Sequence, residues 1–325
     1  MRRFLARRLA HGVLVVFVAT TLAFLLIHMA PGDPFSSTLS SERVDPVALA
    51  NWRAAYGLDR SLPEQYGRFL AQAARGVLGP SISGGRPAAD VLGDALPYTL
   101  LLMGTALLLS FVLGTALGAW QAARRGSAAD KMASTASLVV ASLPEFWLAV
   151  VLILTLAYRV RLFPSGGAID AAMHDALPPV GRIIDILRHL ALPALTLAML
   201  GTASIARYQR AAVLEVLPLD FVRTARAKGL SERVVLWRHA LRNALVPTIV
   251  LAGLSLPTLF GGAVFVEQVF AWPGMGRAAA TAFAARDYQI VVGATILGAV
   301  LVVVGGIMTD VLHAAVDPRV RHGER

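Results

Sequence analysis

Six long stretches that carry almost no charge alternate with charged segments along this chain of 325 residues. A helix needs about 20 apolar residues to cross the hydrocarbon core of a membrane, and each stretch is close to that length. The predicted spans are Leu9–Ala30, Tyr98–Trp120, Met132–Tyr158, Leu190–Ala206, Ala244–Val266 and Tyr288–Leu312. The fourth is short and would rely on tilt or on its flanking residues. The pattern predicts an all-α integral membrane protein with six transmembrane helices.

The distribution of basic residues predicts the side of the membrane on which each loop lies. Six spans put both termini on one side and place loops 31–97, 159–189 and 267–287 on the other. If the termini are cytoplasmic, the cytoplasmic segments are the two terminal segments and segments 121–131 and 207–243. Together they hold 18 of the 30 Lys and Arg residues. Cytoplasmic segments close to span ends carry an excess of Lys and Arg. We therefore predict that both termini are cytoplasmic.

The composition agrees with a membrane protein and excludes several kinds of site. Hydrophobic residues make up 56% of the chain and charged residues 15%, and the mean hydropathy is +0.64. The net charge of +10 comes from basic residues beside apolar stretches, which argues against a nucleic-acid partner. Because the chain has no cysteine, disulfides, thiolate metal sites and cysteine nucleophiles are excluded.

The basic start and apolar stretch of residues 1–30 are also features of a signal peptide. The apolar stretch is too long for one, however, and no small-x-small cleavage site follows it. We therefore expect the first span to be retained as a transmembrane helix.

Four segments are predicted along the chain. Residues 1–30 form the N-terminal transmembrane helix, 31–97 an extracytoplasmic element, 98–312 a five-helix core with a cytoplasmic segment at 207–243, and 313–325 a cytoplasmic tail. Within the extracytoplasmic element, residues 45–76 have the pattern of two short amphipathic helices separated at Gly57–Pro63. A solvated connector is the alternative for this element.

The segment between the fourth and fifth spans is helical in pattern but too charged to cross a membrane. The stretch "LDFVRTARAK" (219–228) is compatible with a helix, Gly229 supplies a flexible or left-handed end, and Ser231 can cap a second helix. The apolar positions of the second helix form one stripe at helical spacing: Leu230, Val234, Trp237 and Leu241. The stripe either rests on lipid or docks into a groove of a partner protein. The position of the whole module between two spans favours docking.

No motif for nucleotide or metal chemistry is present in the sequence. The chain has no G-x-x-x-x-G-K-[ST] phosphate loop, it has only two lysines, and no H-E-x-x-H sequence occurs. The histidines are scattered, without an i, i+4 pair that would suggest a metal site. We predict that the chain is not an enzyme and that any energy for its action comes from partner subunits.

Glu145 stands near the middle of the third predicted span, directly after Pro144. A carboxylate at membrane depth is costly and normally faces the interior of a helix bundle or water. It either meets a solute or a proton in a translocation pathway, or it is lifted to an interface by a kink at Pro144.

Two rival functions are weaker. A membrane enzyme using Glu145 or Asp310 needs a second polar partner at the same depth, and no such constellation is visible. A secondary transporter is expected to show an inverted repeat, which the sequence lacks, and would have no obvious use for the charged module at 207–243.

Several sequence elements together resemble permease subunits of binding-protein-dependent ABC importers, in particular the dipeptide, oligopeptide and nickel branch. The resemblance rests most strongly on "DFVRTARAKGLSERVVLWRHALRNALVP" (220–247), which is similar to the cytoplasmic coupling loop of that branch. It extends to "APGDP" (30–34), "YGLDRSLPEQYGRFL" (56–70), "ASLPEFW" (141–147) and "GGAVFVEQVFAWPGMGR" (261–277), and so covers nearly the full length. In that branch two permeases work as a pair, and one of them carries a large loop after its first span. Residues 31–97 resemble that loop.

The resemblance implies an ABC importer type I permease fold and a multi-pass protein of the bacterial inner membrane. It implies four kinds of partner: a second homologous permease, two cytoplasmic ATPases, an extracytoplasmic substrate-binding protein and the lipid membrane. ATP and magnesium would be bound by the ATPases, so this chain would need no cofactor. The implied function is the import of dipeptides or oligopeptides by alternating access, with nickel or another small solute as the alternative cargo.

The resemblance also assigns roles to particular residues. Those expected to couple the permease to an ATPase are Asp220, Arg223, Thr224, Ala225, Arg226, Ala227, Lys228, Gly229, Leu230, Val234, Trp237 and Leu241. Those expected in the translocation pathway or its outer gate are Pro144, Glu145, Glu267, Trp272 and Asp287. Glu267 and Asp287 stand at the outer ends of spans, where solvated carboxylates would be ordinary.

Overall fold

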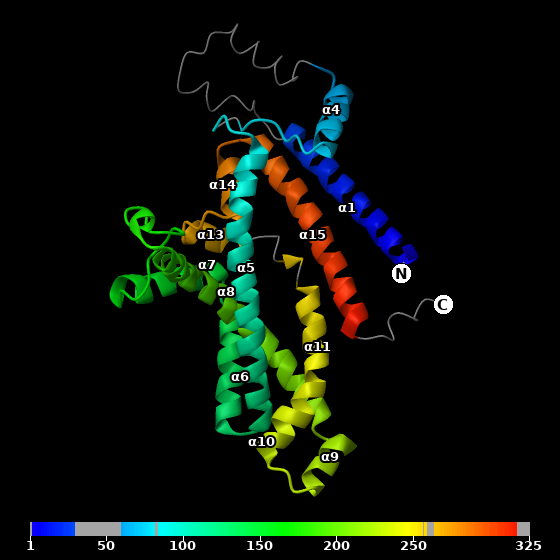
Figure 1. The fold of residues 1–325 in the computed structure, drawn as a ribbon, viewed down its shortest axis with the longest axis vertical. Helices are drawn as coiled ribbons and strands as arrows, with labels where there is room; N and C mark the ends of the chain where they lie inside the picture. The colour runs from blue at the N-terminus through cyan, green and yellow to red at the C-terminus, as the bar shows by residue number, and fades with distance from the viewer. Residues whose placement is uncertain (1, 30–59, 82–83, 256, 259–262, 317–325) are drawn as a thin grey trace. The chain divides into compact units, whose positions relative to one another are not determined.

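The computed structural model describes residues 2–29, 60–81, 84–255, 257–258 and 263–316, and every regular element in these ranges is helical (Figure 1). The chain divides into two compact units. Unit 1 contains residues 1–97 and 274–303, and unit 2 contains residues 98–273 and 304–325. The first of the two predicted amphipathic helices, the whole "APGDP" motif and residues 317–325 of the predicted tail lie outside the described residues.

Among the described residues, four helices are long and apolar enough to cross a membrane, and each coincides with one predicted span. They are α1 (Arg2–Met29), α5 (Ala88–Ala123), α8 (Pro179–Val216) and α15 (Tyr288–Val316). α5 and α8 extend well beyond the predicted ends of their spans, because a helix does not stop where the membrane stops. This confirms the all-helical membrane architecture for the first, second, fourth and sixth predicted spans.

The third predicted span is a broken helix. It consists of α6 (Ala128–Ala141), α7 (Glu145–Leu152) and η1 (Ile153–Arg159), and the two parts meet at an angle of 105°. Pro144 has no N–H to continue the ladder of α6 and instead stands immediately before α7 with a φ of −62°. If this bent pair crosses once, the described residues contain up to five spans.

The fifth predicted span is not one continuous helix in the described residues. α11 (Leu241–Leu254) is capped by Ser255, and the short helix α13 (Val264–Val269) follows after a partly undescribed stretch. At its other end α11 continues directly from α10 (Glu232–Val234) and η3 (Val235–Ala240). The second helix of the charged module therefore runs without interruption into the predicted span. The sequence pattern predicts instead one helix in the module and a separate one for the span.

Unit 1 is assembled around a small apolar core formed by Ala88, Leu92, Ala282 and Ile290. These residues come from α5, α14 (Met275–Ala284) and α15. The second predicted amphipathic helix is present as α4 (Leu62–Ala74). It lies against α1, where the Tyr66 hydroxyl is 2.7 Å from the Thr21 hydroxyl and the rings of Tyr66 and Phe24 are 5.2 Å apart.

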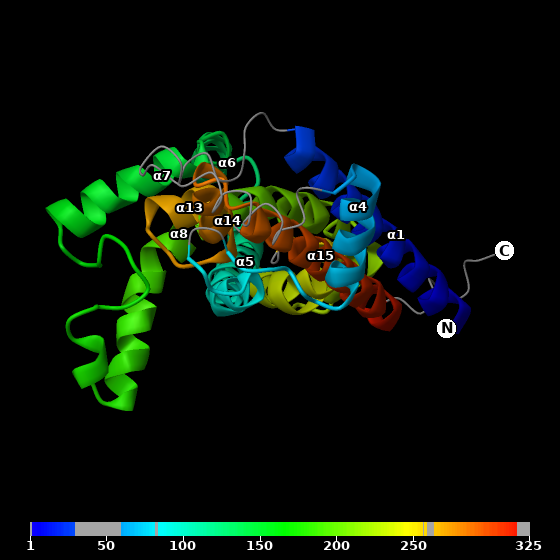
Figure 2. The ribbon, with the colours of Figure 1, turned by 90° about the horizontal axis from the view of Figure 1, so that it is seen from above.

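Unit 2 is organised around α8, which contacts α6, α7 and α11. Its largest core contains Leu102, Leu192, Phe270 and Trp272 together with smaller residues. α5 also approaches α8 closely, because Gly114 and Gly118 on α5 present no side chain toward it. Seen from above in Figure 2, the loop that joins η1 to α8 extends outward from this unit. That loop contains the single turn η2 (His174–Ala176).

Candidate functional site

Residues 220–240 of the charged module fold into two helical segments joined by a turn at Gly229. We call this part the elbow, and it lies at one end of unit 2 (Figure 1). α9 (Asp220–Ala227) is followed by its C-cap residue Lys228 and then by Gly229, which has a φ of +77°. No described atom lies within 4 Å of a β-carbon placed on Gly229, so glycine is required there for its backbone conformation and not for space. The predicted left-handed stop is confirmed.

One face of the elbow is buried inside the protein. Val222 and Ala225 of α9 pack against Val235 and Ala240 of η3, and all four side chains are almost completely buried. Burying these apolar side chains fixes the angle between α9 and the helix that follows. The elbow is therefore held to the spans as a rigid body.

Most of the predicted apolar stripe lies outside this buried face and is exposed. Leu230, Val234 and Trp237 are exposed by 38%, 38% and 47%, respectively. Leu241, the fourth member of the stripe, is only 7% exposed and packs with Leu236 in an internal core. Leu241 is therefore not exposed with the other three residues, because it is already part of α11, and its coupling role stays a prediction.

Polar contacts within the elbow close the glycine turn. Arg226 Nε and Nη2 donate to the two carboxylate oxygens of Glu232 at 2.7 and 3.2 Å, across Gly229. The hydrogen bond and charge of Arg226 lower the pKa of the Glu232 carboxyl. The Thr224 hydroxyl donates to the Asp220 carbonyl at 2.9 Å.

Most of the remaining predicted coupling residues are accessible. Ala225 is buried against η3, whereas these side chains are exposed: Asp220, Arg223, Thr224, Arg226, Ala227 and Lys228. The elbow therefore exposes both basic and apolar side chains.

Glu145 is the first residue of α7, immediately after the break in the third span. Its side chain is partly buried, and Pro144 is exposed. A carboxylate in the first turn of a helix interacts favourably with the free backbone N–H groups there. The expected kink at Pro144 is thus present as the 105° bend that places Glu145 at a helix terminus.

Glu267 and Trp272 lie together in the core of unit 2, and neither is exposed. The Thr99 hydroxyl donates to Glu267 Oε1 at 3.0 Å, and Trp272 Nε1 donates to the Tyr98 carbonyl at 3.0 Å. Both bonds tie α13 and the turn after it to the start of the unit 2 part of α5. The alternative of a solvated carboxylate at Glu267 is wrong, because its side chain is completely buried, and its role at the gate stays a prediction.

Asp287 belongs to unit 1 and is also completely buried. It precedes α15 and accepts a hydrogen bond from the Ser81 hydroxyl. Ser81 in turn accepts from the Gly84 N–H at 2.9 Å, so Asp287 holds the loop before α5 in place. The alternative of a solvated carboxylate is wrong here too, because the Asp287 side chain is buried, and its role at the gate also stays a prediction.

A second group of polar residues, at the elbow end of α8, was not singled out from the sequence. Arg210 donates to both carboxylate oxygens of Asp130, from Nε at 2.9 Å and from Nη2 at 2.8 Å. The neighbouring Gln209 contacts α11 through the Ala244 carbonyl and the Thr248 hydroxyl. The partners are 35 to 80 residues apart, so no local spacing indicates them.

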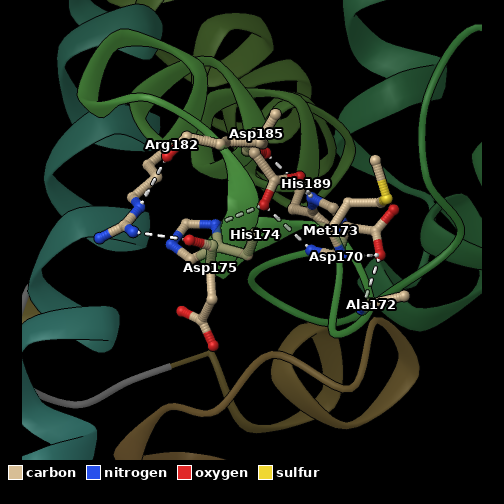
Figure 3. Close-up of polar contacts among 9 residues, drawn as sticks. Asp170, Ala172, Met173, His174, Asp175, Arg182, Asp185 and His189 are labelled. Atoms are coloured by element: carbon tan, nitrogen blue, oxygen red, sulfur yellow. Dashed lines mark hydrogen bonds and ion pairs between the residues drawn. The ribbon is translucent and has the colours of Figure 1, made fainter.

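A third polar cluster lies at the opposite end of α8, where the extended loop returns to the helix (Figure 3). Asp185 Oδ2 accepts from the Asp170 N–H at 3.0 Å and lies 2.6 Å from His174 Nδ1, and His189 Nδ1 lies 3.1 Å from Asp185 Oδ1. Arg182 donates to the carbonyls of Asp175 and Leu177. Within the described residues, no group of three or more His, Asp or Glu side chains can hold a metal ion.

Comparison with known protein families covers nearly the whole chain. Residues 114–322 match the family described as "binding-protein-dependent transport system inner membrane component", and residues 1–103 match the N-terminal region of the same kind of component. A solved structure of the MetNI methionine ABC transporter in inward-facing conformations shares the fold. Its TM-score is 0.51 at 22% sequence identity, over 72% of this chain and 97% of that chain.

Curated relatives match from end to end. The oligopeptide transport system permease protein AppB of Bacillus subtilis is 36% identical over 99% of this chain and 100% of its own length. The di/tripeptide transport system permease protein DppB of Pseudomonas aeruginosa is 38% identical over 99% of both chains. The dipeptide transport system permease protein DppB of Escherichia coli is 34% identical over the same shares. With an all-helical fold, a rigid charged elbow and matches over its full length, this chain belongs to the family of inner-membrane components of binding-protein-dependent transport systems.

Proposed function

We propose that this chain is the transmembrane permease subunit of an ATP-driven importer that moves dipeptides or oligopeptides into the cytoplasm. The observation that carries the proposal is the elbow after α8, which is rigid on its inner face and exposes Leu230, Val234 and Trp237 on its outer face. Exposed apolar side chains on a fixed helix are suited to a groove on a partner protein. The full-length relatives named as peptide permeases support the choice of cargo.

The proposed topology has six crossings with both termini in the cytoplasm of a bacterial cell, in the inner membrane. The four long helices and the bent pair formed by α6 and α7 support five of these crossings. α11 together with α13 supplies the remaining one. The excess of Lys and Arg in the segments assigned to the cytoplasm supports this orientation.

The proposed partners are a second homologous permease, two ATPases and an extracytoplasmic substrate-binding protein. The sequence carries no phosphate loop, so ATP and magnesium belong to the ATPases in this proposal, and this chain catalyses no reaction itself. The elbow is the surface on which an ATPase docks. Its basic side chains and its three exposed apolar residues complement an acidic and apolar groove.

The proposed mechanism is alternating access driven by the ATPases. Closure of the ATPases on nucleotide displaces the elbow, and the buried contacts between α9 and η3 transfer that displacement to α8 and α11. Nucleotide drives the change only because the ATPases bind it with different affinity in the two states. Glu145, at the break between α6 and α7, is the proposed polar group of the pathway, and the segment containing Glu267 and Trp272 is proposed to support the outer gate.

The docking surface is tested with two substitutions in the elbow. Trp237→Asp places a charge in the apolar surface, and Gly229→Pro fixes φ near −65° where the structure has +77°. Each variant is expected to remain in the membrane and to lose ATP-dependent uptake and co-purification of the ATPase. Val77→Asp is the matched control, since Val77 is an exposed apolar residue of unit 1. Normal uptake by both elbow variants would contradict the coupling role.

The cargo is tested separately on the binding protein that co-purifies with the complex. Calorimetric titration with trialanine is expected to give saturable binding, and titration with nickel chloride none. Binding of nickel without any binding of trialanine would replace the peptide assignment while leaving the transport role intact.

A further inference from the structure

Four polar side chains at the elbow end of unit 2 form a connected group that we call the basal cluster: Asp130, Gln209, Arg210 and Thr248. Asp130 belongs to α6, Gln209 and Arg210 belong to α8, and Thr248 belongs to α11. Two consecutive residues of α8 thus contact two different neighbouring helices. The proposed mechanism assigns this group no role.

The contact with α6 is a bidentate ion pair. Arg210 donates from Nε and Nη2 to the two oxygens of Asp130, and the Asp130 side chain is only 3% exposed. Asp130 also accepts from the Gly126 N–H at 3.0 Å, while the Ser127 hydroxyl caps α6 by accepting from the Asp130 N–H. Two parallel hydrogen bonds fix both the distance and the relative orientation of the two helices.

The contact with α11 is a pair of hydrogen bonds made by a fully buried amide. Gln209 Nε2 donates to the Ala244 carbonyl at 3.2 Å, and its Oε1 accepts from the Thr248 hydroxyl. Gln209 is 0% exposed, and Thr248 is 3% exposed. Since the donor and the acceptor of one amide are both used on α11, rotation or sliding of α8 against α11 would leave buried polar atoms unpaired.

The backbone of α5 reaches the same level of α8. A β-carbon on Gly118 would lie 2.4 Å from the Ala206 carbonyl oxygen, 2.8 Å from the Gln209 β-carbon and 2.9 Å from the Arg210 nitrogen. α5, α6 and α11 are therefore all held to α8 around Gln209 and Arg210. No other level of α8 in the described residues has polar contacts of this kind with two helices.

The basal cluster is directly continuous with the elbow. Val213, one turn beyond Gln209 on α8, packs with Leu236 and Leu241 of the helix that leaves the elbow. Val216 and Leu217 then pack against the buried face of α9. A displacement of α9 thus reaches the basal cluster through one uninterrupted sequence of buried contacts.

We infer that the basal cluster is the joint at which displacement of the elbow is shared among α6, α8 and α11, so that the three helices move together. Asp130 and Arg210 act as positioning residues in this role. Ion pairs that are largely buried contribute little net stability compared with apolar packing, and their best-attested use is to fix one geometry. Because α6 leads into the break before Glu145, the joint connects the elbow to the proposed pathway.

The inference rests on the proposed function, and the experiment separates the two. The complete complex is purified, reconstituted in liposomes and supplied with its binding protein, and two rates are measured: ATP hydrolysis and ATP-dependent uptake of radiolabelled trialanine. The native complex tests the proposed function. If it shows neither uptake nor hydrolysis stimulated by the binding protein, the proposed function fails whatever the variants do.

The joint is tested by Asp130→Asn, which keeps the shape of the side chain but removes its charge. We expect the ratio of uptake to ATP hydrolysis to fall at least tenfold, while the ATPases remain bound and hydrolysis continues. Asp94→Asn is the matched control, because Asp94 pairs with Arg86 at 2.9 Å on the exposed surface of unit 1, and it should leave the ratio unchanged. The inference is overturned if the ratio equals that of the native complex and any decrease in the two rates is explained by a smaller amount of assembled complex. The ion pair would then have only a structural role.

A second variant keeps the inference testable if Asp130→Asn assembles poorly. The chain has no cysteine, so Asp130→Cys combined with Arg210→Cys introduces a unique thiol pair in this subunit, used with cysteine-free partners. A short bifunctional thiol reagent then replaces the ion pair by a covalent bridge. Bridging is expected to restore the ratio of uptake to hydrolysis at least fivefold over the unbridged protein. Bridging that leaves the ratio unchanged, or lowers it, would show that the two helices do not move together.

Discussion

The close approach of α5 and α8 makes a sharp prediction about a single methyl group. Gly118→Ala adds a β-carbon at a point where the Ala206 carbonyl oxygen and the Arg210 nitrogen would be 2.4 and 2.9 Å away. Both of these atoms belong to the backbone of α8 and cannot rotate aside. The two helices must therefore separate to admit the methyl group, and this would disturb the packing around the basal cluster.

The size of the effect follows from two opposing contributions. Overpacking a well-packed contact costs about 1–3 kcal/mol, and we expect about 3 kcal/mol because the clash is with backbone. Alanine regains about 1 kcal/mol over glycine inside a helix. The net loss is then about 2 kcal/mol, which corresponds to a decrease in Tm of about 4–8 °C for a domain of 150–250 residues.

The matched control is Gly104→Ala on the same helix. No described atom lies within 4 Å of a β-carbon at Gly104, so only the gain in helix propensity of about 1 kcal/mol should remain there. Tm is measured in detergent by heating aliquots and recording the amount of monodisperse protein by size-exclusion chromatography. If Gly118→Ala melts at or above the temperature of the native protein, the tight crossing of α5 and α8 is refuted.

Three further predictions concern other polar contacts. Asp287→Asn should lower Tm, because a buried carboxylate that anchors the loop before α5 is replaced by an amide with two donors to satisfy, a cost of about 1–3 kcal/mol. Trp272→Phe should cost about 1 kcal/mol by leaving the Tyr98 carbonyl without its indole donor, measured as a smaller decrease in Tm. Glu232 has a lowered pKa in the folded protein, so its contact with Arg226 stabilises the turn above the carboxyl's unfolded pKa and is lost as pH falls through the folded value. After correction for intrinsic exchange, hydrogen exchange of the Gly229 turn should therefore accelerate on acidification in the native protein. In Glu232→Gln it should be fast at every pH.

The long helices could be predicted from the sequence because charge is so unfavourable in a membrane that its absence marks a span. The same criterion does not indicate where a helix breaks. Pro144 does carry a signal for the broken third span, since proline lacks the N–H of a helical residue. The fifth predicted span is equally free of charge, yet α11 ends at Ser255, inside an apolar stretch.

The elbow could be predicted in part. Gly229 and the spacing of the stripe are local features, and the turn and three exposed apolar residues agree with them. Leu241 belongs to the same stripe but is buried, because helical spacing identifies a stripe and not the point at which the helix enters the bundle. Contacts such as Asp130 with Arg210 join residues 80 positions apart, and only the folded arrangement brings them together.

α8 contains 38 residues, so at 1.5 Å per residue it is about 57 Å long, nearly twice the hydrocarbon thickness of about 30 Å. Because the basal cluster ties α8 to α6 and α11, a tilt of α8 about this level would carry the other two helices with it. From Gln209 to the end of α8 the short arm is about 10 Å, and from Gln209 back to Asp185 the long arm is about 36 Å. The ratio of the long arm to the short arm is about 3.5, so a tilt that shifts the elbow by about 2 Å would shift the loop around Asp185 by about 7 Å. In the proposed importer, a small movement of the docked ATPase would thus become a larger movement of the loop around Asp185, without any long-distance rearrangement of side chains.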